Sequence, residues 1–137
     1  MRKGFTLVEL LIVLAVIAAL MSVATPLALN AVKNAKASQV AQNFRNIKVA
    51  FENYFNTEKP EDPKSINIAT LYSEGYLSSS PTNFTITVAA TTAGVYTVKI
   101  TYSGGDVDVD KVKNNGLPEV TSSATDLILT FNVYKWW

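Results

Sequence analysis

A long apolar segment near the N-terminus limits what this 137-residue chain can fold into. Residues 5–24 form a run of 20 with only three polar side chains, Thr6, Glu9 and Ser22. As an α-helix the run is about 30 Å long, the thickness of the hydrocarbon core of a bilayer. Arg2 and Lys3 precede it, and the next cation is Lys33. The positive-inside rule therefore predicts a membrane helix with a cytoplasmic N-terminus and an exported remainder.

Glu9 conflicts with an ordinary membrane segment. It lies four residues after Phe5, about 6 Å further along a helix. A charge at mid-bilayer costs roughly 2.5–3.5 kcal/mol on insertion scales, and less near the interface. A secretory signal cleaved after Ser22-Val23-Ala24 does not explain the length of the run or its charge. A plain signal anchor explains the length but gives Glu9 no partner.

The residues around Glu9 support a third interpretation. Residues 4–9 read GFTLVE, which resembles the class III signal of type IV pilins and type II secretion pseudopilins. Arg2 and Lys3 match the short basic leader of that family, and Pro26 matches its helix-disrupting proline. The strong resemblance covers roughly residues 1–55, and the rest of the chain agrees in layout.

The resemblance implies a specific maturation. In that family a prepilin peptidase cleaves after the glycine and methylates the new N-terminus, which here means cleavage between Gly4 and Phe5 and N-methylation of Phe5. Glu9 of one subunit would then lie beside the amine of Phe5 on its neighbour, because a pair in low dielectric is far less costly than a lone carboxylate. Thr6 either hydrogen-bonds to that amine or to a carbonyl, or bonds to its own helix backbone.

The resemblance also implies a function and a set of partners. The chain would be a structural subunit of a type IV pilus-like filament, with its apolar helix in the filament core. Its partners would be other copies of itself, the prepilin peptidase, the membrane and, indirectly, an inner-membrane platform protein and an assembly ATPase. It would reside in the inner membrane before entering an extracellular filament or a periplasmic pseudopilus. A type II secretion pseudopilin and a minor pilin of DNA uptake are the alternatives within the family.

Helical periodicity continues beyond the apolar run. Pro26 should kink or locally open the helix near residues 22–26, because it lacks an N–H and clashes with the preceding turn. An apolar stripe then follows at helical spacing, made of Val40, Phe44, Ile47, Phe51 and Tyr54. Two prolines and four charges end the helix near Thr57. A short helical turn ending at Gly75 should cover the core edge with Leu71, Tyr72, Tyr76 and Leu77.

A period of two predicts a sheet in the remainder of the chain. The expected strands are 84–88, 96–102, 107–109 and 127–133. A hairpin signal at residues 103–106 precedes the third strand, and a loop over residues 114–126 precedes the last. The predicted fold class is α+β, with one long N-terminal helix packed on an antiparallel meander of about four strands.

These patterns divide the chain into five segments. They are a leader, a membrane or filament-core helix, an amphipathic helix half, a helix-to-sheet loop and a sheet. Their predicted bounds are 1–4, 5–26, 27–57, 58–83 and 84–137, and residues 27–137 form the globular head.

Composition leaves few routes to catalysis. The chain has no Cys and no His, which removes disulfides, thiol nucleophiles and the usual acid–base and soft-metal groups. Its 12 basic and 11 acidic side chains give no indication of a nucleic-acid partner. We therefore predict a structural protein and not an enzyme. A membrane-anchored enzyme or solute-binding module is the alternative outside the family.

The acidic residues Asp106, Asp108 and Asp110 form the one acidic cluster that could hold a metal. On a strand they would share one face, about 7 Å apart, and calcium could neutralise them. The resemblance adds that major pseudopilins often bind calcium near the C-terminus. A solvated acidic face that protects a sheet edge is the preferred interpretation, so no cofactor is predicted.

Two adjacent aromatic residues, Trp136 and Trp137, close the sequence. Terminal aromatics usually cover the edge of a core, and this is the interpretation we prefer. The alternative is an exposed contact for a neighbouring subunit or an adhesive surface.

Overall fold

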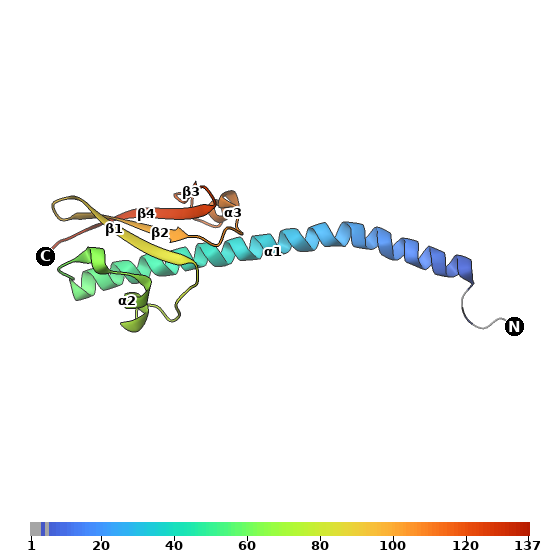
Figure 1. Cartoon of the computed structure of the whole chain (residues 1–137), viewed down its shortest axis with the longest axis horizontal. Coiled ribbons are helices and arrows are strands. Elements are labelled where there is room, and N and C mark those ends of the chain that lie inside the picture. Colours follow the sequence, from blue (N-terminus) through green and yellow to red (C-terminus); the bar gives the residue numbers. More distant parts are fainter. Residues whose placement is uncertain (1–3, 5) are drawn as a thin grey trace. The chain divides into compact units, whose positions relative to one another are not determined.

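The computed structural model describes Gly4 and residues 6–137. Its elements are α1 (Leu7–Glu58), η1 (Pro63–Ser65), α2 (Ile68–Ser73), β1 (Phe84–Thr92), β2 (Val95–Tyr102), α3 (Val109–Asn114), β3 (Thr121–Ser123) and β4 (Asp126–Tyr134). They form an α+β fold with one long helix and a four-stranded antiparallel sheet, which confirms the predicted class (Figure 1). The chain divides into two compact units, one ending at Ala35 and the other beginning at Lys36.

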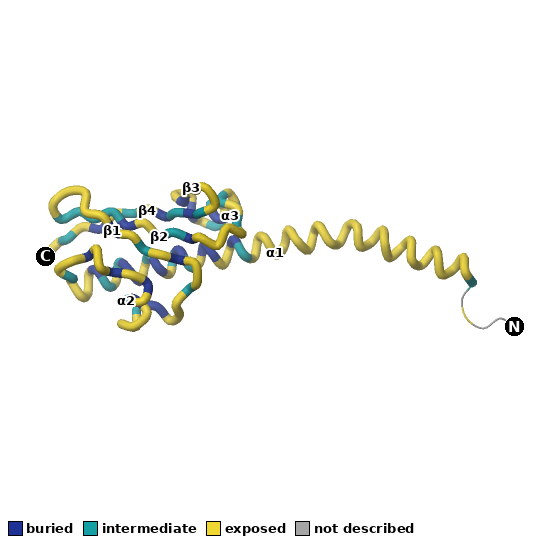
Figure 2. The backbone as a smooth tube through the Cα atoms, in the orientation of Figure 1, coloured by how far each residue is buried: buried dark blue, intermediate teal, exposed yellow. Residues whose placement is uncertain are grey.

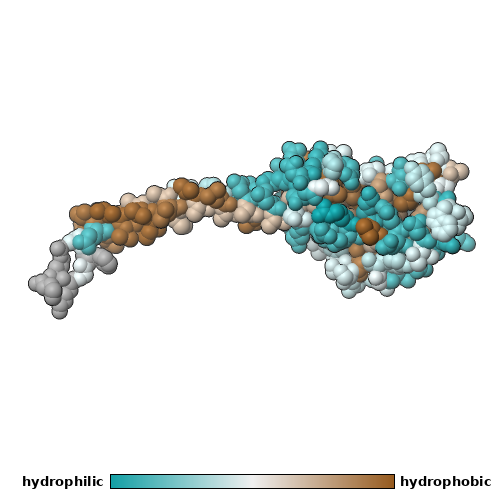
Figure 3. All heavy atoms as spheres, turned by 180° about the vertical axis from the view of Figure 1, so that it is seen from behind, coloured by the Kyte–Doolittle hydropathy of each residue, from teal (hydrophilic) through white to brown (hydrophobic). Residues whose placement is uncertain are grey.

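The first unit contains the N-terminal half of α1, and its helical side chains are exposed on every side (Figure 2). Figure 3 shows the apolar residues of this half as a continuous band. By length and composition α1 contains a segment that is able to cross a membrane, and none of that segment is buried inside the protein. A helix that is apolar all round needs an apolar environment, which lipid or other protein can supply.

Pro26 lies inside α1 without ending it. The helix is continuous from Leu7 to Glu58, so the kink or local opening expected near residues 22–26 does not interrupt it. Pro26 has no N–H to offer to the carbonyl of Ser22, one turn earlier. The hydroxyl of Ser22 in turn donates to the carbonyl of Ala19, at 2.7 Å.

The second half of α1 supplies the core of the second unit. The predicted stripe residues Val40, Phe44, Ile47 and Phe51 are at most 2% exposed. Tyr54 is only half-buried, and Phe55, which the stripe did not include, is buried in its place. Phe44 contacts Phe84 of β1 with ring centroids 5.2 Å apart, and Phe51 contacts Phe131 of β4 at 5.9 Å. The helix therefore packs on both an outer and an inner strand.

The sheet has the order β1-β2-β4-β3, which is not the simple meander expected. β2 pairs with β1 on one side and with β4 on the other, so the chain must leave β2, form α3 and β3, and return as an inner strand. Paired residues such as Ile100 and Leu129 point to the same face, and both are fully buried there. This face is the one that α1 covers (Figures 1 and 2).

The strand predicted at residues 107–109 is wrong, and so is the hairpin before it. This segment begins α3, whose N-cap is Asp108: its side chain accepts from the backbone N–H of Asp110 at 3.0 Å. Lys111 and Lys113 lie in the last turn, where cations are favoured by the helix dipole. An aspartate at the N-cap followed by lysines in the last turn favours a short helix. Here this preference outweighs the alternation of Val107 and Val109, which had suggested a strand. The fourth strand is instead β3, inside the predicted loop.

The segment between α1 and the sheet agrees with the sequence in outline. α2 ends before Gly75, which has a φ of +84°. Leu71 and Leu77 are buried and Tyr76 is half-buried, as expected for residues that cover a core edge. Tyr72 is 51% exposed, so its predicted place at the core edge is wrong.

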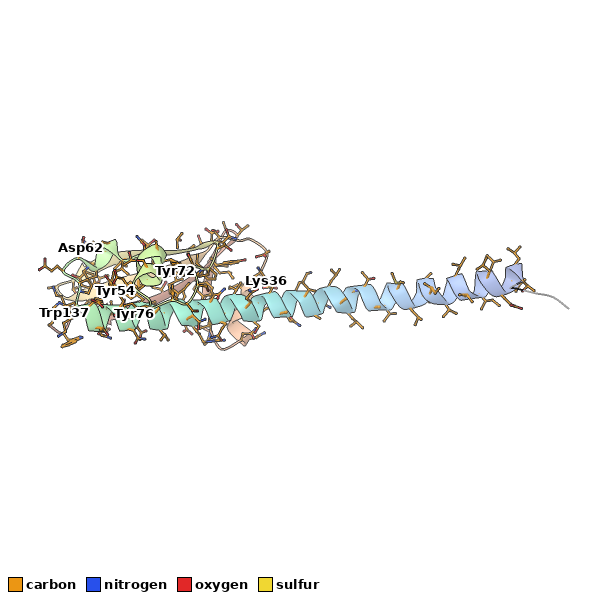
Figure 4. The ribbon with its side chains drawn as sticks, turned by 90° about the horizontal axis from the view of Figure 1, so that it is seen from below. Lys36, Tyr54, Asp62, Tyr72, Tyr76 and Trp137 are labelled. Atoms are coloured by element: carbon orange, nitrogen blue, oxygen red, sulfur yellow. The ribbon has the colours of Figure 1, made fainter. Side chains whose placement is uncertain are left out.

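The two terminal tryptophans have different environments. Trp137 is half-buried and lies 4.8 Å from the ring of Phe55, so it covers the end of the core as expected (Figure 4). Trp136 is 61% exposed, and its indole N–H donates to Asn56 Oδ1 at 3.0 Å. The C-terminus is thus tied to the end of α1.

Replacing Phe51 by Ala tests the packing of α1. Phe51 is 0% exposed, so Phe51→Ala should lower the free energy of unfolding by about 3–5 kcal/mol. Val49 is on the same helix and is 56% exposed, so Val49→Ala should change it by less than about 0.5 kcal/mol. Chemical unfolding followed by tryptophan fluorescence gives both values. A loss below about 1 kcal/mol for Phe51→Ala would contradict the packing.

Candidate functional site

The predicted processing residues lie at the edge of the described chain. Gly4 is exposed and has a φ of +93°, a backbone conformation that favours glycine. Phe5, the predicted mature N-terminus, and the leader cations Arg2 and Lys3 lie outside the described residues. The structure therefore gives geometry for the residues that follow the predicted cleavage site.

Thr6 forms the N-cap of α1. Its carbonyl accepts the first helical hydrogen bond from the N–H of Leu10 at 3.1 Å, and its Oγ1 accepts from the N–H of Glu9, also at 3.1 Å. The second bond satisfies one of the donors that every helix leaves unpaired at its start. Of the two roles weighed for Thr6, the structure contains the bond to its own helix backbone.

Glu9 lies in the first turn of α1, three residues after the cap. Threonine followed three residues later by glutamate is the sequence signature of a capping box, so the spacing alone was enough to predict this bond. A carboxylate in this turn is favoured by the helix dipole, typically by 0.3–1 kcal/mol. The cost of Glu9 in a membrane helix is therefore partly offset within the subunit, before any neighbour contributes.

The three aspartates predicted as a weak calcium candidate do not share a strand face. Asp108 caps α3, Asp110 lies in the first turn of that helix, and Asp106 precedes both in a loop. The described residues contain no group of three or more His, Cys, Asp or Glu that could hold a metal ion. The strand geometry on which the calcium argument rested is thus wrong.

Asp106 instead joins a polar contact that the sequence did not reveal. The hydroxyl of Tyr102 donates to Asp106 Oδ1 at 2.5 Å, and Lys36 Nζ lies 3.7 Å from Asp106 Oδ2. The Tyr102 hydrogen bond, helped by Lys36, holds the pKa of Asp106 below its ordinary value. Burial and the bond to Asp106 raise the pKa of Tyr102 to about 12. Gly104 fits against the Tyr102 ring, where an added Cβ would overlap the hydroxyl.

Comparison with known proteins gives two matches. Residues 1–25 match the family described as the prokaryotic N-terminal methylation motif. The chain is 34% identical over 123 residues to the type IV wide pilus major component PilA4 of Thermus thermophilus, covering 90% of this chain and 91% of the relative. No solved structure matches the chain.

The Tyr102–Asp106 contact predicts a pH-dependent stability. Because the pKa of Asp106 is lowered in the folded state, its contribution is present above the ordinary value of 3.8 and is lost as pH falls through the folded value. Asp106→Asn should therefore be less stable than wild type at neutral pH, and the gap should narrow in acid. Unfolding free energies between pH 7 and about pH 2.5 give the gap, with Glu119→Gln as the control for losing one surface charge. A gap that stays constant would contradict the assignment.

Proposed function

The chain belongs to the type IV pilin family, and on this basis we propose how its N-terminal residues serve assembly. It is a structural subunit that assembles with its own kind into a pilus-like filament and is processed by a prepilin peptidase. It is anchored in a membrane by its apolar helix and then becomes part of an extracellular filament. The observation that carries this function is the similarity to a pilus subunit over nearly the whole chain.

The peptidase cleaves between Gly4 and Phe5 and methylates the amine of Phe5. Two features support this placement. The methylation motif includes both residues, and Gly4 is exposed with nothing within 4 Å of the position where a Cβ would lie.

Glu9 of one subunit pairs with the positive amine of Phe5 on the next. The carboxylate is exposed on α1 and is surrounded by exposed apolar side chains, so in the filament core it lies in a medium of low dielectric. There an unpaired charge is costly, and an opposite charge at the correct axial offset reduces that cost. Thr6 contributes by fixing the first turn, and with it the direction of Glu9.

Pro26 gives the helix a place to bend during assembly. It leaves the carbonyl of Ser22 without its usual helical donor, which weakens α1 locally while the helix remains continuous.

The structural role also fits the absence of Cys and His from the chain, because these residues are the commonest catalytic groups of enzymes.

The assembly route and the segment limits are further parts of the proposal. Insertion leaves the N-terminus in the cytoplasm. The head, from residue 27 onward, lies on the other side of the membrane. An inner-membrane platform protein and a cytoplasmic ATPase drive assembly indirectly. A pilus is favoured over a secretion pseudopilus or a DNA-uptake apparatus, because the similar protein is a major pilus component.

The processing proposal predicts the N-terminus of the mature protein. Intact-mass analysis of membrane-bound protein should give a chain that begins at methylated Phe5. Gly4→Leu should leave the leader in place, because a bulky residue replaces the one the peptidase selects. A mature chain that begins at Thr25 would contradict the proposal, since it would result from ordinary signal-peptide cleavage.

The pairing proposal predicts that Glu9→Ala separates insertion from assembly. Removing the charge should leave membrane insertion unimpaired. The same change leaves a neighbouring amine unpaired in low dielectric, so filament yield in a sheared fraction should fall. Glu9→Gln should be intermediate at best, because it keeps an acceptor but not the charge. Normal filament yield for Glu9→Ala at normal membrane levels would refute the pairing.

A further inference from the structure

A small hollow lies beside the C-terminal half of β4, at the end of the head where α1 finishes. It has a volume of about 240 Å³ and is lined by Glu52 and Asn56 of α1 and by Asn132, Val133 and Tyr134 of β4. Pockets for drug-sized ligands usually measure about 300–1,000 Å³. This one suits a single ring-sized group and is not used by the assembly function described above.

The polar groups of the hollow are held in fixed orientations. Asn56 Oδ1 accepts from the indole N–H of Trp136 at 3.0 Å, and an indole N–H can only donate, so the amide nitrogen of Asn56 remains as a donor. Asn132 Oδ1 accepts from the hydroxyl of Thr97 at 2.9 Å, which also leaves its amide nitrogen. Glu52 adds two acceptor oxygens. Donors and acceptors are therefore mixed around one small space.

Two exposed aromatic residues lie at this end of the head: Tyr134 lines the hollow, and Trp136 is hydrogen-bonded to Asn56, one of the lining residues. Within residues 36–137, all of which the structure describes, the exposed large apolar side chains are Val49, Tyr72, Tyr134 and Trp136. Tyr134 and Trp136 are the most exposed of these, at 62% and 61%. The ammonium of Lys59 lies 4.6 Å from the centre of the Trp136 ring and holds it in place. An exposed aromatic ring beside a polar hollow offers a flat apolar surface that a ligand can cover.

We propose that this hollow binds one ring of a neutral pyranose oligosaccharide, and that the assembled filament displays it. A pyranose has a face of C–H groups that packs on an aromatic ring, and hydroxyl groups that both donate and accept. The C–H face matches the ring of Tyr134, which lines the hollow, and the hydroxyl groups match the polar groups of Asn56, Asn132 and Glu52. The carboxylate of Glu52 disfavours acidic sugars through like-charge repulsion. The binding itself does not depend on assembly, whereas the display rests on the proposed function.

The position of the tryptophans makes the test direct. The chain has two Trp, and both are at this end of the head, so its tryptophan fluorescence reports on this region alone. The full chain is dispersed in a zwitterionic detergent without a sugar headgroup and titrated with cellotetraose, with tetragalacturonate as the acidic comparison. We expect a saturable fluorescence change with cellotetraose and none with tetragalacturonate.

Variants show whether the sugar binds in the hollow. They also separate a loss of binding from a loss of folding. Asn132→Ala should weaken binding about tenfold, because it removes hydrogen bonds from an exposed residue. Tyr134→Ala should abolish it, while Tyr72→Ala, an exposed aromatic on α2, should bind as the wild type does. Glu52→Gln should admit tetragalacturonate. Circular dichroism melting of each variant verifies that the head is folded, and Asn132→Ala suffices if Tyr134→Ala does not fold.

Three results would overturn the proposal. The first is no saturable change up to about 10 mM cellotetraose, a concentration well above that of even weak specific binding. The second is equal affinity in wild type, Asn132→Ala and Tyr134→Ala. The third is binding by dispersed subunits that disappears in intact filaments, because a second copy of the chain would then cover the hollow and the filament would not display it.

Discussion

The contact between the second half of α1 and the sheet is the interaction on which the rest of the protein depends. Phe44, Phe51 and Phe55 lie on one side of the helix and are at most 1% exposed. Burying an apolar side chain of this size contributes about 1.5–3 kcal/mol, so these few residues account for much of the head's stability. The first half of the same helix has apolar residues on all sides and buries none of them. One helix thus meets two different environments, and its sequence pattern changes accordingly.

Polar side chains of α1 bind the segments that follow β2, α3 and β4. Lys36 meets Asp106 after β2, Arg45 Nη1 donates to the carbonyl of Asn115 after α3 at 2.7 Å, and Asn56 accepts from Trp136 after β4. They come from the beginning, middle and end of the helix segment within the head. The chain has no cysteine, so these individually weak contacts link the loops to α1 without a covalent bond. Losing one of these contacts should therefore affect only the loop that it binds.

The sequence predicted the elements whose apolar pattern repeats over many residues. It did not predict the elements whose structure depends on a few residues. The stripe of α1 extends over several turns, and four of its five predicted residues are buried, whereas Tyr54 is half-buried. Phe55 and three alanines, which the stripe did not include, are buried as well. The segment at 106–114 is short, and its two valines alternate as in a strand, yet Asp108 as a cap and the following lysines make it helical. The site at Thr6 and Glu9 was predicted by resemblance, but the hydrogen bond between them follows from the T-x-x-E spacing alone. The contact of Tyr102 with Asp106 depends on a loop conformation that no spacing encodes.

The inner position of β4 has a consequence for the order in which the protein can fold. β4 is the last strand in the sequence, but it lies between β2 and β3 and carries Phe131 onto α1. Asn56 and Trp136, which close the end of the head, are 80 residues apart. Contacts of such separation are slow to form, and a chain is synthesised from its N-terminal side. Until the last residues have been synthesised, the aromatic stripe of α1 has only part of its cover. A chain that has lost its C-terminal strand would thus expose part of that stripe to water.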